Sequence, residues 1–203
     1  MTGCVSTGIT PSNSWHTSSA SVYGWLTLLK PTAFVSNVLD AMQSWPPFGK
    51  RPPTESGELG RGALLFAQAE IARGAREIPP GTNGGPFVWE YTGSRTDGPW
   101  CAAFVQWCFE MSSESLPWRR THSAKGLYKR IGRAGSFVDV PLPGDVVCWD
   151  RGIIGSPAGH TGIVARVIGD TFWSIEGNRG RAGIVAEFRH EIGEARLLGF
   201  ARS

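Results

Sequence analysis

The chain has 203 residues, of which 41% are hydrophobic and 18% are charged, a composition that suits a globular protein with a buried core. Twenty basic and 17 acidic residues leave a net charge of +3, which is too small to indicate a nucleic-acid-binding protein. No run of 18 apolar residues occurs, so we expect no transmembrane segment. The first twenty residues contain no Lys or Arg and therefore lack the basic start of a signal peptide.

Residues 1–57 are expected to form an N-terminal extension and linker that is partly flexible. Their first part is rich in Ser, Thr and Gly. Apolar clusters within residues 22–45 predict one short helix, and the pairs Pro46-Pro47 and Pro52-Pro53 favour a stiff, extended connection after it. One folded domain is therefore expected over residues 58–203.

Helical patterns occupy the first part of this domain. Leu64, Ala67 and Ile71 recur at steps of three and four residues and predict a helix over residues 59–74. Residues 101–111 continue without a helix breaker after Asp97, which can cap a helix, and Pro99, which suits a first turn. A further helix or helical turn is expected over residues 121–133.

The pattern changes to that of strands after Pro141. Short β-rich runs are separated by turns that contain Gly, Asp, Asn and Arg, and such runs are typical of antiparallel strands. Helices followed by strands predict an α+β fold in which the helices pack on one side of a small antiparallel sheet. The expected strands cover residues 145–149, 160–168, 171–176, 183–189 and 197–201.

The four cysteines show neither a CxxC pair nor a zinc-ligand spacing. They are Cys4, Cys101, Cys108 and Cys148. Cysteine is among the most buried residue types, so we expect Cys108 and Cys148 in the core. Cys101 differs because it lies in the first turn of its expected helix, where unpaired backbone N–H groups and the helix dipole favour a thiolate.

Among the four histidines, His160 is the best candidate for a general base. His16 lies in the Ser/Thr-rich start, His122 on an expected loop and His190 at the end of a strand. His160 opens the clearest strand, between two glycines that allow another element to approach closely.

Strand alternation places His160 among polar side chains. Ile163, Ala165 and Val167 alternate on one face, and Trp173 and Ile175 form the apolar face of the next strand. Matching these two faces puts His160 on the opposite face, where an acceptor side chain can orient its second ring nitrogen. The side chains expected beside it are those of Ser174, Glu176 and Asn178.

Each of these residues also has an ordinary structural interpretation. A lone Cys is commonly a core residue, a lone His a surface residue and a lone Glu a solvated charge. Helix position and strand parity are independent arguments, and together they favour a catalytic set without excluding the structural roles. The candidate set is Cys101, His160, Glu176 and Asn178.

At these residues the chain resembles the CHAP family, the cysteine- and histidine-dependent amidohydrolases/peptidases of the papain-like group that includes NlpC-type wall hydrolases. The likeness covers roughly residues 58–203, whereas residues 1–57 have no recognised counterpart. The matching stretches are Asn83-Gly84-Gly85-Pro86 leading to Tyr91, Pro99 to Trp107, Pro143-Gly144-Asp145-Val146-Val147, Gly159 to Val164, and Ile175-Glu176-Gly177-Asn178.

The resemblance implies a papain-like CHAP fold and a role for each candidate residue. Cys101 would be the nucleophile, His160 the base, Glu176 the group that orients the imidazole, and Asn178 a fourth, supporting polar residue. The backbone N–H of Cys101 would contribute to the oxyanion hole. The implied enzyme is a bacteriolytic peptidoglycan hydrolase that cleaves an amide bond, as an endopeptidase or an N-acetylmuramoyl-L-alanine amidase, through a cysteine acyl-enzyme.

Some members of the family bind calcium in an acidic loop before the cysteine. Residues 92–97 contain one acid and one Arg, so we expect no metal, and nothing indicates another cofactor. We expect a monomer that acts on peptidoglycan outside the cytoplasm. Two alternatives stay open, namely an amidase on a small soluble amide or peptide, and a non-catalytic wall-binding or virion structural module.

Overall fold

The computed structural model describes residues 57–95 and 98–203. Nearly all of the extension expected over residues 1–57, with its short helix, and the proposed cap Asp97 lie outside the described residues. No helix in the described part is long and apolar enough to cross a membrane. The elements in chain order are α2 (Glu58–Ala72), α3 (Pro86–Thr92), α4 (Cys101–Ser112), α5 (Ala124–Ala134), β1 (Ser136–Val138), β2 (Val146–Asp150), β3 (Gly159–Ile168), β4 (Thr171–Arg179), β5 (Ile184–Glu191) and β6 (Leu197–Arg202).

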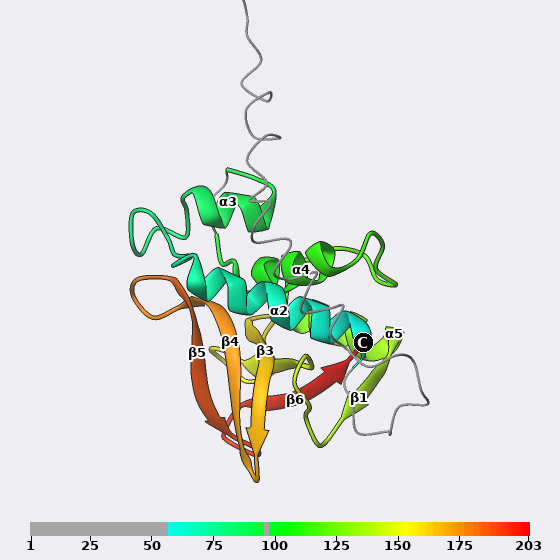
Figure 1. Cartoon of the computed structure of the whole chain (residues 1–203). Helices are drawn as coiled ribbons and strands as arrows, with labels where there is room; N and C mark the ends of the chain where they lie inside the picture. Colours follow the sequence, from blue (N-terminus) through cyan, green and yellow to red (C-terminus); the bar gives the residue numbers. More distant parts are fainter. Residues whose placement is uncertain (1–56, 96–97) are drawn as a thin grey trace, which may run out of the picture. The chain divides into compact units, whose positions relative to one another are not determined.

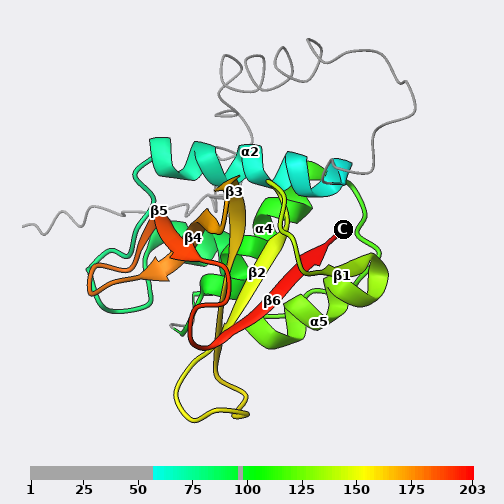
Figure 2. The same ribbon diagram turned by 90° about the horizontal axis from the view of Figure 1, so that it is seen from below.

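The strands form one antiparallel sheet in the order β1-β6-β2-β3-β4-β5, and Figure 2 labels all six strands. Strand β6 returns from the end of the chain to lie between β1 and β2. The α+β order expected from the sequence is confirmed. Strand β1 was not expected, because three residues are too few to show an alternating pattern, and it exists through its pairing with β6.

The helices cover one face of the sheet, as expected. Helix α4 packs on β3 and β4, with α2 beside it, and α5 packs towards β2 and β6 (Figures 1 and 2). Every residue of α4 from Cys101 to Phe109 is buried, because this helix is apolar on nearly all sides and lies between α2 and the sheet. Helix α5 is instead amphipathic. Its Leu127 and Ile131 are buried, and the Ser123 hydroxyl caps it by accepting the Gly126 N–H.

The opposite face of the sheet carries a second, smaller apolar cluster. Strand β2 is buried on both faces, so its residues alternate between the helical core and this cluster. The ring centroids of Phe172 and Phe200 lie 5.1 Å apart in an edge-to-face contact. The buried members of the cluster are Val147, Trp149, Val164, Phe172 and Phe200.

A register shift divides the β3–β4 hairpin. Ile163 pairs with Ile175, in agreement with the expectation that the two share one face, but the register shifts between Val164 and Arg166. The shift moves Val167 to the second cluster, so the expectation that Ile163, Ala165 and Val167 share one face is wrong at Val167.

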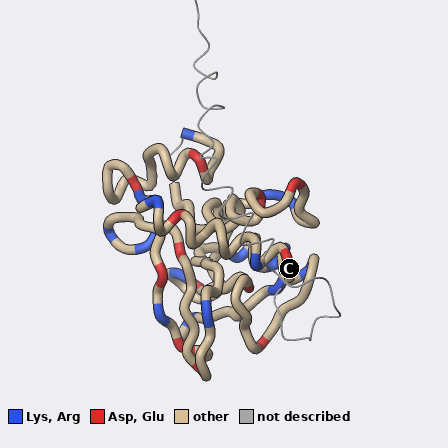
Figure 3. Tube along the Cα trace, in the orientation of Figure 1, with Lys and Arg blue, Asp and Glu red and all other residues tan. Residues whose placement is uncertain are grey.

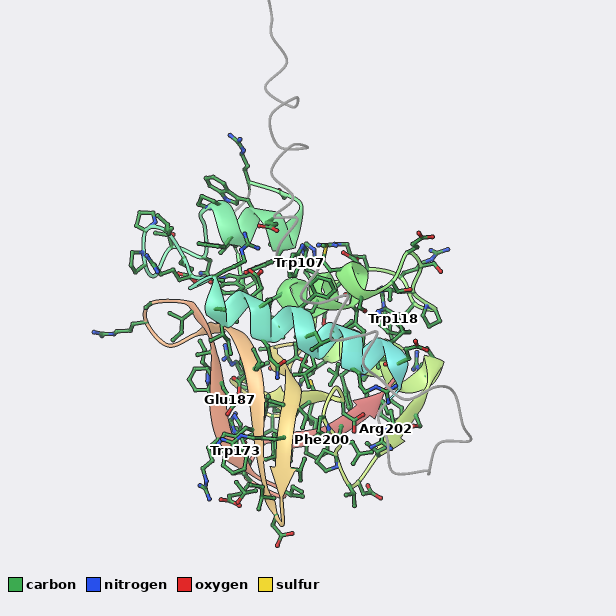
Figure 4. All side chains as sticks on the ribbon, in the orientation of Figure 1. Trp107, Trp118, Trp173, Glu187, Phe200 and Arg202 are labelled. Atoms are coloured by element: carbon green, nitrogen blue, oxygen red, sulfur yellow. The ribbon has the colours of Figure 1, made fainter. Side chains whose placement is uncertain are left out.

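Past the shift, exposed side chains form a ladder across the strands. The Arg166 guanidinium lies 3.6 Å from the ring centroid of Trp173 and its Nη2 donates to Glu187 at 3.0 Å. Figure 4 labels Trp173 and Glu187 on this part of the sheet. Basic and acidic residues are interspersed along these strands in Figure 3, so the charges here largely compensate one another.

Gly177 lets α4 approach β4. A Cβ atom at this position would lie 2.5 Å from the Trp100 ring and 3.0 Å from the Phe104 side chain. Both aromatic residues are fully buried, so neither has room to move away. The close approach brings the start of α4 against the sheet.

Gly177→Ala should therefore destabilise the protein by about 1–3 kcal/mol, because the added methyl group overpacks this contact. Urea denaturation followed by circular dichroism measures the effect. Gly98→Ala is the matched control, since a Cβ at Gly98 meets nothing within 4 Å. Equal stability of the two variants would show that the contact between α4 and β4 is not tightly packed.

Candidate active site

Cys101 lies in the first turn of α4, as the sequence predicted, but the helix begins at Cys101 with Trp100 as its N-cap, so the expected cap at Asp97 and the place of Pro99 in the first turn are wrong. The preceding residue, Trp100, provides no side-chain cap, so the N–H groups of the first turn have no side-chain acceptor there. Trp100 is itself fixed, because its indole N–H donates to Glu77 Oε1 at 2.9 Å and its ring stacks on Tyr91. The start of α4 is thus held by an anchored aromatic residue.

Asn178 belongs to this anchor and not to the environment of His160. With its amide oriented to satisfy both groups, its oxygen accepts the Trp100 backbone N–H at 3.0 Å and its nitrogen donates to Glu77 Oε1 at 3.3 Å. Its φ of 57° and the register break between Glu176 and Arg179 turn it out of the strand alternation. The expectation that Asn178 shares the face of His160 is therefore wrong.

Cys101 meets the sheet where β3 and β4 separate. Their pairing begins at Ile163 and Ile175, so the first residues of β3 are not paired with β4. Hydrogen bonding from the backbone of Thr161 and Ala102 acts on the Cys101 sulfur and lowers its pKa. Thr161 follows His160 directly in the chain, so the thiol and the imidazole lie on neighbouring parts of the structure.

His160 lies on the face opposite to the helices. It pairs with Trp149 across β2 and β3, and the two ring centroids are 5.8 Å apart. Its Nε2 lies 2.6 Å from Glu176 Oε2, whereas its Nδ1 is buried and has no hydrogen-bond partner. Because a carboxylate only accepts, Nε2 carries the proton and the Nδ1 lone pair is free to take one.

Glu176 is fully buried and each of its oxygens has two partners. Oε2 accepts from His160 and contacts Arg179 Nε at 3.1 Å. Oε1 accepts from the Ser174 hydroxyl at 2.8 Å and from His190 Nε2 at 2.7 Å. Four donors around one carboxylate satisfy it as an anion without water.

His190 was not selected from the sequence. It lies fourteen residues from Glu176, and its place beside Glu176 depends on how β4 and β5 pair. Strand alternation could have identified it. Glu176 pairs with Ala186, and His190 lies four residues further along β5, opposite Phe172, so it is on the same face as Glu176. Extending the predicted strand by one residue would have placed His190 on the face of Glu176.

Burial favours the neutral forms of both Cys101 and His160. It raises the pKa of the Cys101 thiol, against the lowering effects of Arg151 and the backbone hydrogen bonds. It also lowers the pKa of His160, against the hydrogen bond to Glu176. The sequence led us to expect a helix terminus to favour the thiolate, whereas in the structure burial raises the pKa of Cys101.

Glu176, in contrast, is stabilised in its charged form. Burial alone would raise the pKa of Glu176, but the hydrogen bonds from His160 and His190 lower it to about 2. Burial likewise opposes charge on His190, yet its hydrogen bond with Glu176 and its contacts with Glu194 raise its pKa. An ionised carboxylate therefore lies between two histidines whose pKa values are shifted in opposite directions.

Of the predicted site residues, the structure brings Glu176 to His160 and Cys101 to the adjoining Thr161, and it places Asn178 on the helix anchor. Cys108 and Cys148 are buried free thiols, as expected. Within the described residues, no three His, Cys, Asp or Glu side chains converge as metal ligands would.

Comparisons with known proteins give one family and two solved structures. The CHAP domain family matches residues 91–178, which span the Cys101 helix and reach the Glu176 strand, and the match confirms the resemblance seen in the sequence. No curated protein matches the chain. Two solved structures of Ly7917, one of them with "the hydrolyzing product of MDP", share 18% and 19% identity at TM-scores of 0.47. Each covers 70% of this chain, and the chain spans 62% of theirs.

Glu176→Gln should lower the free energy of unfolding by about 3–5 kcal/mol at neutral pH, because it removes the buried anion that pairs with His190 and Arg179. The folded state lowers the pKa of Glu176 from 4.5 to about 2, so its ionised form stabilises the protein above pH 4.5. That contribution is lost as the pH falls towards 2. Urea denaturation at a series of pH values should therefore show the variant approaching the wild type below pH 4.5.

The control is Glu187→Gln, which removes an exposed carboxylate paired with Arg166 and should cost less than about 1 kcal/mol. A loss for Glu176→Gln no larger than this control would contradict the role of Glu176 as the central buried anion.

Proposed function

We propose that this chain, which carries a CHAP domain over residues 91–178, is a cysteine-dependent hydrolase of amide bonds in peptidoglycan. The observation that supports this most is the state of His160. Its Nε2 is held by a buried carboxylate, its Nδ1 is free, and the adjoining Thr161 backbone faces the Cys101 sulfur. A base with a fixed tautomer, carried by the residue before one whose backbone hydrogen-bonds a thiol at a helix start, supports nucleophilic catalysis.

The first half of the reaction forms an acyl-enzyme. His160 Nδ1 accepts the Cys101 thiol proton as the sulfur attacks the amide carbonyl, because both groups are neutral before substrate binds. The backbone N–H of Cys101, at the open start of α4, is the proposed donor to the developing oxyanion. The proton then passes from Nδ1 to the leaving amine as the C–N bond breaks.

The second half restores the enzyme. Water enters after the amine leaves, gives a proton to His160 Nδ1 and attacks the thioester carbonyl. The carbon–sulfur bond breaks, the acid is released and the thiolate recovers its proton from His160. Glu176 accepts from Nε2 throughout and stabilises the imidazolium that forms in each half-reaction.

Asn178 has a different role in this proposal from the one implied by the family. It holds the Trp100 backbone N–H and so fixes where α4 begins. We assign it as a positioning residue for Cys101 that leaves the titration of His160 unaffected. The substrate class and action outside the cytoplasm come from the CHAP family; the proposal covers both the endopeptidase and the amidase reaction.

Digestion of purified peptidoglycan by the full chain tests the proposal. The wild type should release soluble muropeptides with a new amine terminus, identified by mass spectrometry. Cys101→Ala should lower the rate by at least about 10³-fold, because no nucleophile remains. Cys108→Ala, which removes a buried core thiol on the same helix, should retain the activity.

Release by Cys101→Ala at the wild-type rate would exclude Cys101 as the nucleophile. Wild-type protein that releases nothing from peptidoglycan but cleaves a soluble peptide amide would assign it to small amides. Inactivity on both, with a thiol that does not react with iodoacetamide, would favour a non-catalytic binding or structural module.

Asn178→Ala should lower kcat, and it should reduce stability by about 1–3 kcal/mol, because the Trp100 N–H loses its acceptor. The acidic limb of the kcat/KM profile should stay at the wild-type pH, since the His160–Glu176 pair is intact. A shifted limb would show that Asn178 acts on the base. Thr92→Ala, whose hydroxyl donates to Val88 O on neighbouring α3, serves as a control of similar local cost.

A further inference from the structure

A second histidine, His190, completes the surroundings of Glu176 on the side away from His160. Its Nε2 lies 2.7 Å from Glu176 Oε1, and its Nδ1 lies 2.9 Å from Glu194 Oε1. The ring is 7% exposed and is packed between Trp149 and Phe172, at centroid distances of 4.7 and 5.2 Å. These contacts leave it one orientation.

Both nitrogens of His190 face atoms that already accept other hydrogen bonds. Glu176 Oε1 accepts the Ser174 hydroxyl, and Glu194 Oε1 accepts the Trp149 indole N–H at 2.6 Å. A ring nitrogen next to each oxygen must therefore donate, and an imidazole that donates from both nitrogens is an imidazolium. The geometry thus makes His190 a cation.

The two histidines on Glu176 are in opposite states. His160 donates from Nε2 alone and keeps a free Nδ1, whereas His190 donates from both nitrogens. His190 and Arg179 together place two positive charges on the carboxylate that also serves His160. This sharing reduces the negative charge available to attract a proton to His160.

We propose that His190 is a positioning residue that, as an imidazolium held between Glu176 and Glu194, fixes the carboxylate and keeps His160 neutral and ready to act as a base. The catalytic consequence rests on the proposed function, but the charge states do not. Glu176 and Glu194 are the acidic groups that face His190, and Arg179 and His160 reach it through Glu176. Burial opposes this charge, yet the pKa of His190 is raised, in agreement with the positive charge that its hydrogen bonds require.

Removing the positive charge of His190 should shift the pKa of His160 in one direction. In His190→Gln, Glu176 loses one of its positive neighbours, so the protonated form of His160 becomes more favourable. The titration midpoint of His160 should rise by about one pH unit. The acidic limb of the kcat/KM profile should rise with it, because the base must be unprotonated to act.

Nitrogen-15 NMR of the histidine rings in the full chain measures these states directly. At pH 7 the wild type should show His190 protonated on both nitrogens and His160 protonated on Nε2 alone. Resonances are assigned by single His→Gln variants. His122→Gln removes an exposed histidine whose Nε2 contacts Arg120, so it should leave the His160 midpoint unchanged and is the matched control.

A His190 ring with a single proton at pH 7 would overturn the proposal. So would a His160 midpoint in His190→Gln equal to that of the wild type, even if the variant were less stable, because that result describes a structural residue only. The NMR result does not depend on activity, so a chain that hydrolyses no peptidoglycan would contradict the proposed function and leave this inference to be decided separately.

Glu194→Gln is the second variant, in case His190→Gln does not fold. It keeps an oxygen for His190 Nδ1 and Trp149 Nε1 while removing one negative charge at the partly exposed end of the chain of contacts. The His190 midpoint should then fall. An unchanged midpoint would show that Glu194 does not stabilise the positive charge of His190. It would overturn the proposal that His190 is an imidazolium held between Glu176 and Glu194.

Discussion

The buried carboxylate of Glu176 organises one face of the sheet. It has no contact with solvent, and its donors come from three strands: His160 on β3, Ser174 and Arg179 on its own strand β4, and His190 on β5. A buried charge is tolerated only when it is paired and hydrogen-bonded, so these donors must all be in place together. The strands that carry them are thereby tied at one point.

The second constraint is the approach of α4 to that point. Gly177 removes the side chain that would hold the helix away, and Trp100 occupies the space gained, fixed by Glu77 and Asn178. The absence of β3–β4 pairing before Ile163 leaves the Thr161 backbone accessible to the Cys101 sulfur. Helix position and strand separation therefore act together to bring the thiol to the Thr161 backbone, next in the chain to His160.

These two constraints explain why the thiol and imidazole are neutral in the resting protein. Close packing removes water from both, and loss of hydration disfavours the thiolate and the imidazolium alike. The charge in the site resides instead on Glu176, where two cations and two further donors compensate it. In the proposed mechanism the ionised carboxylate stabilises His160 when it becomes protonated, so that step needs little reorganisation.

The sequence by itself determined the succession of helices and then strands, the place of Cys101 in the first turn of its helix, the shared face of Ile163 and Ile175, and the common face of Glu176 and His160. These follow from local rules, namely helical spacing, helix-breaking residues and the two-residue period of a strand. The rules failed where the backbone departs from regular geometry: at the register shift that moved Val167 and at the left-handed conformation that turned Asn178 towards Trp100. Only the tertiary structure decided three features: strand β1, the contact of Cys101 with Thr161, and the place of His190 beside Glu176. Each depends on contacts between segments that are distant in the sequence, and local sequence patterns do not encode such contacts.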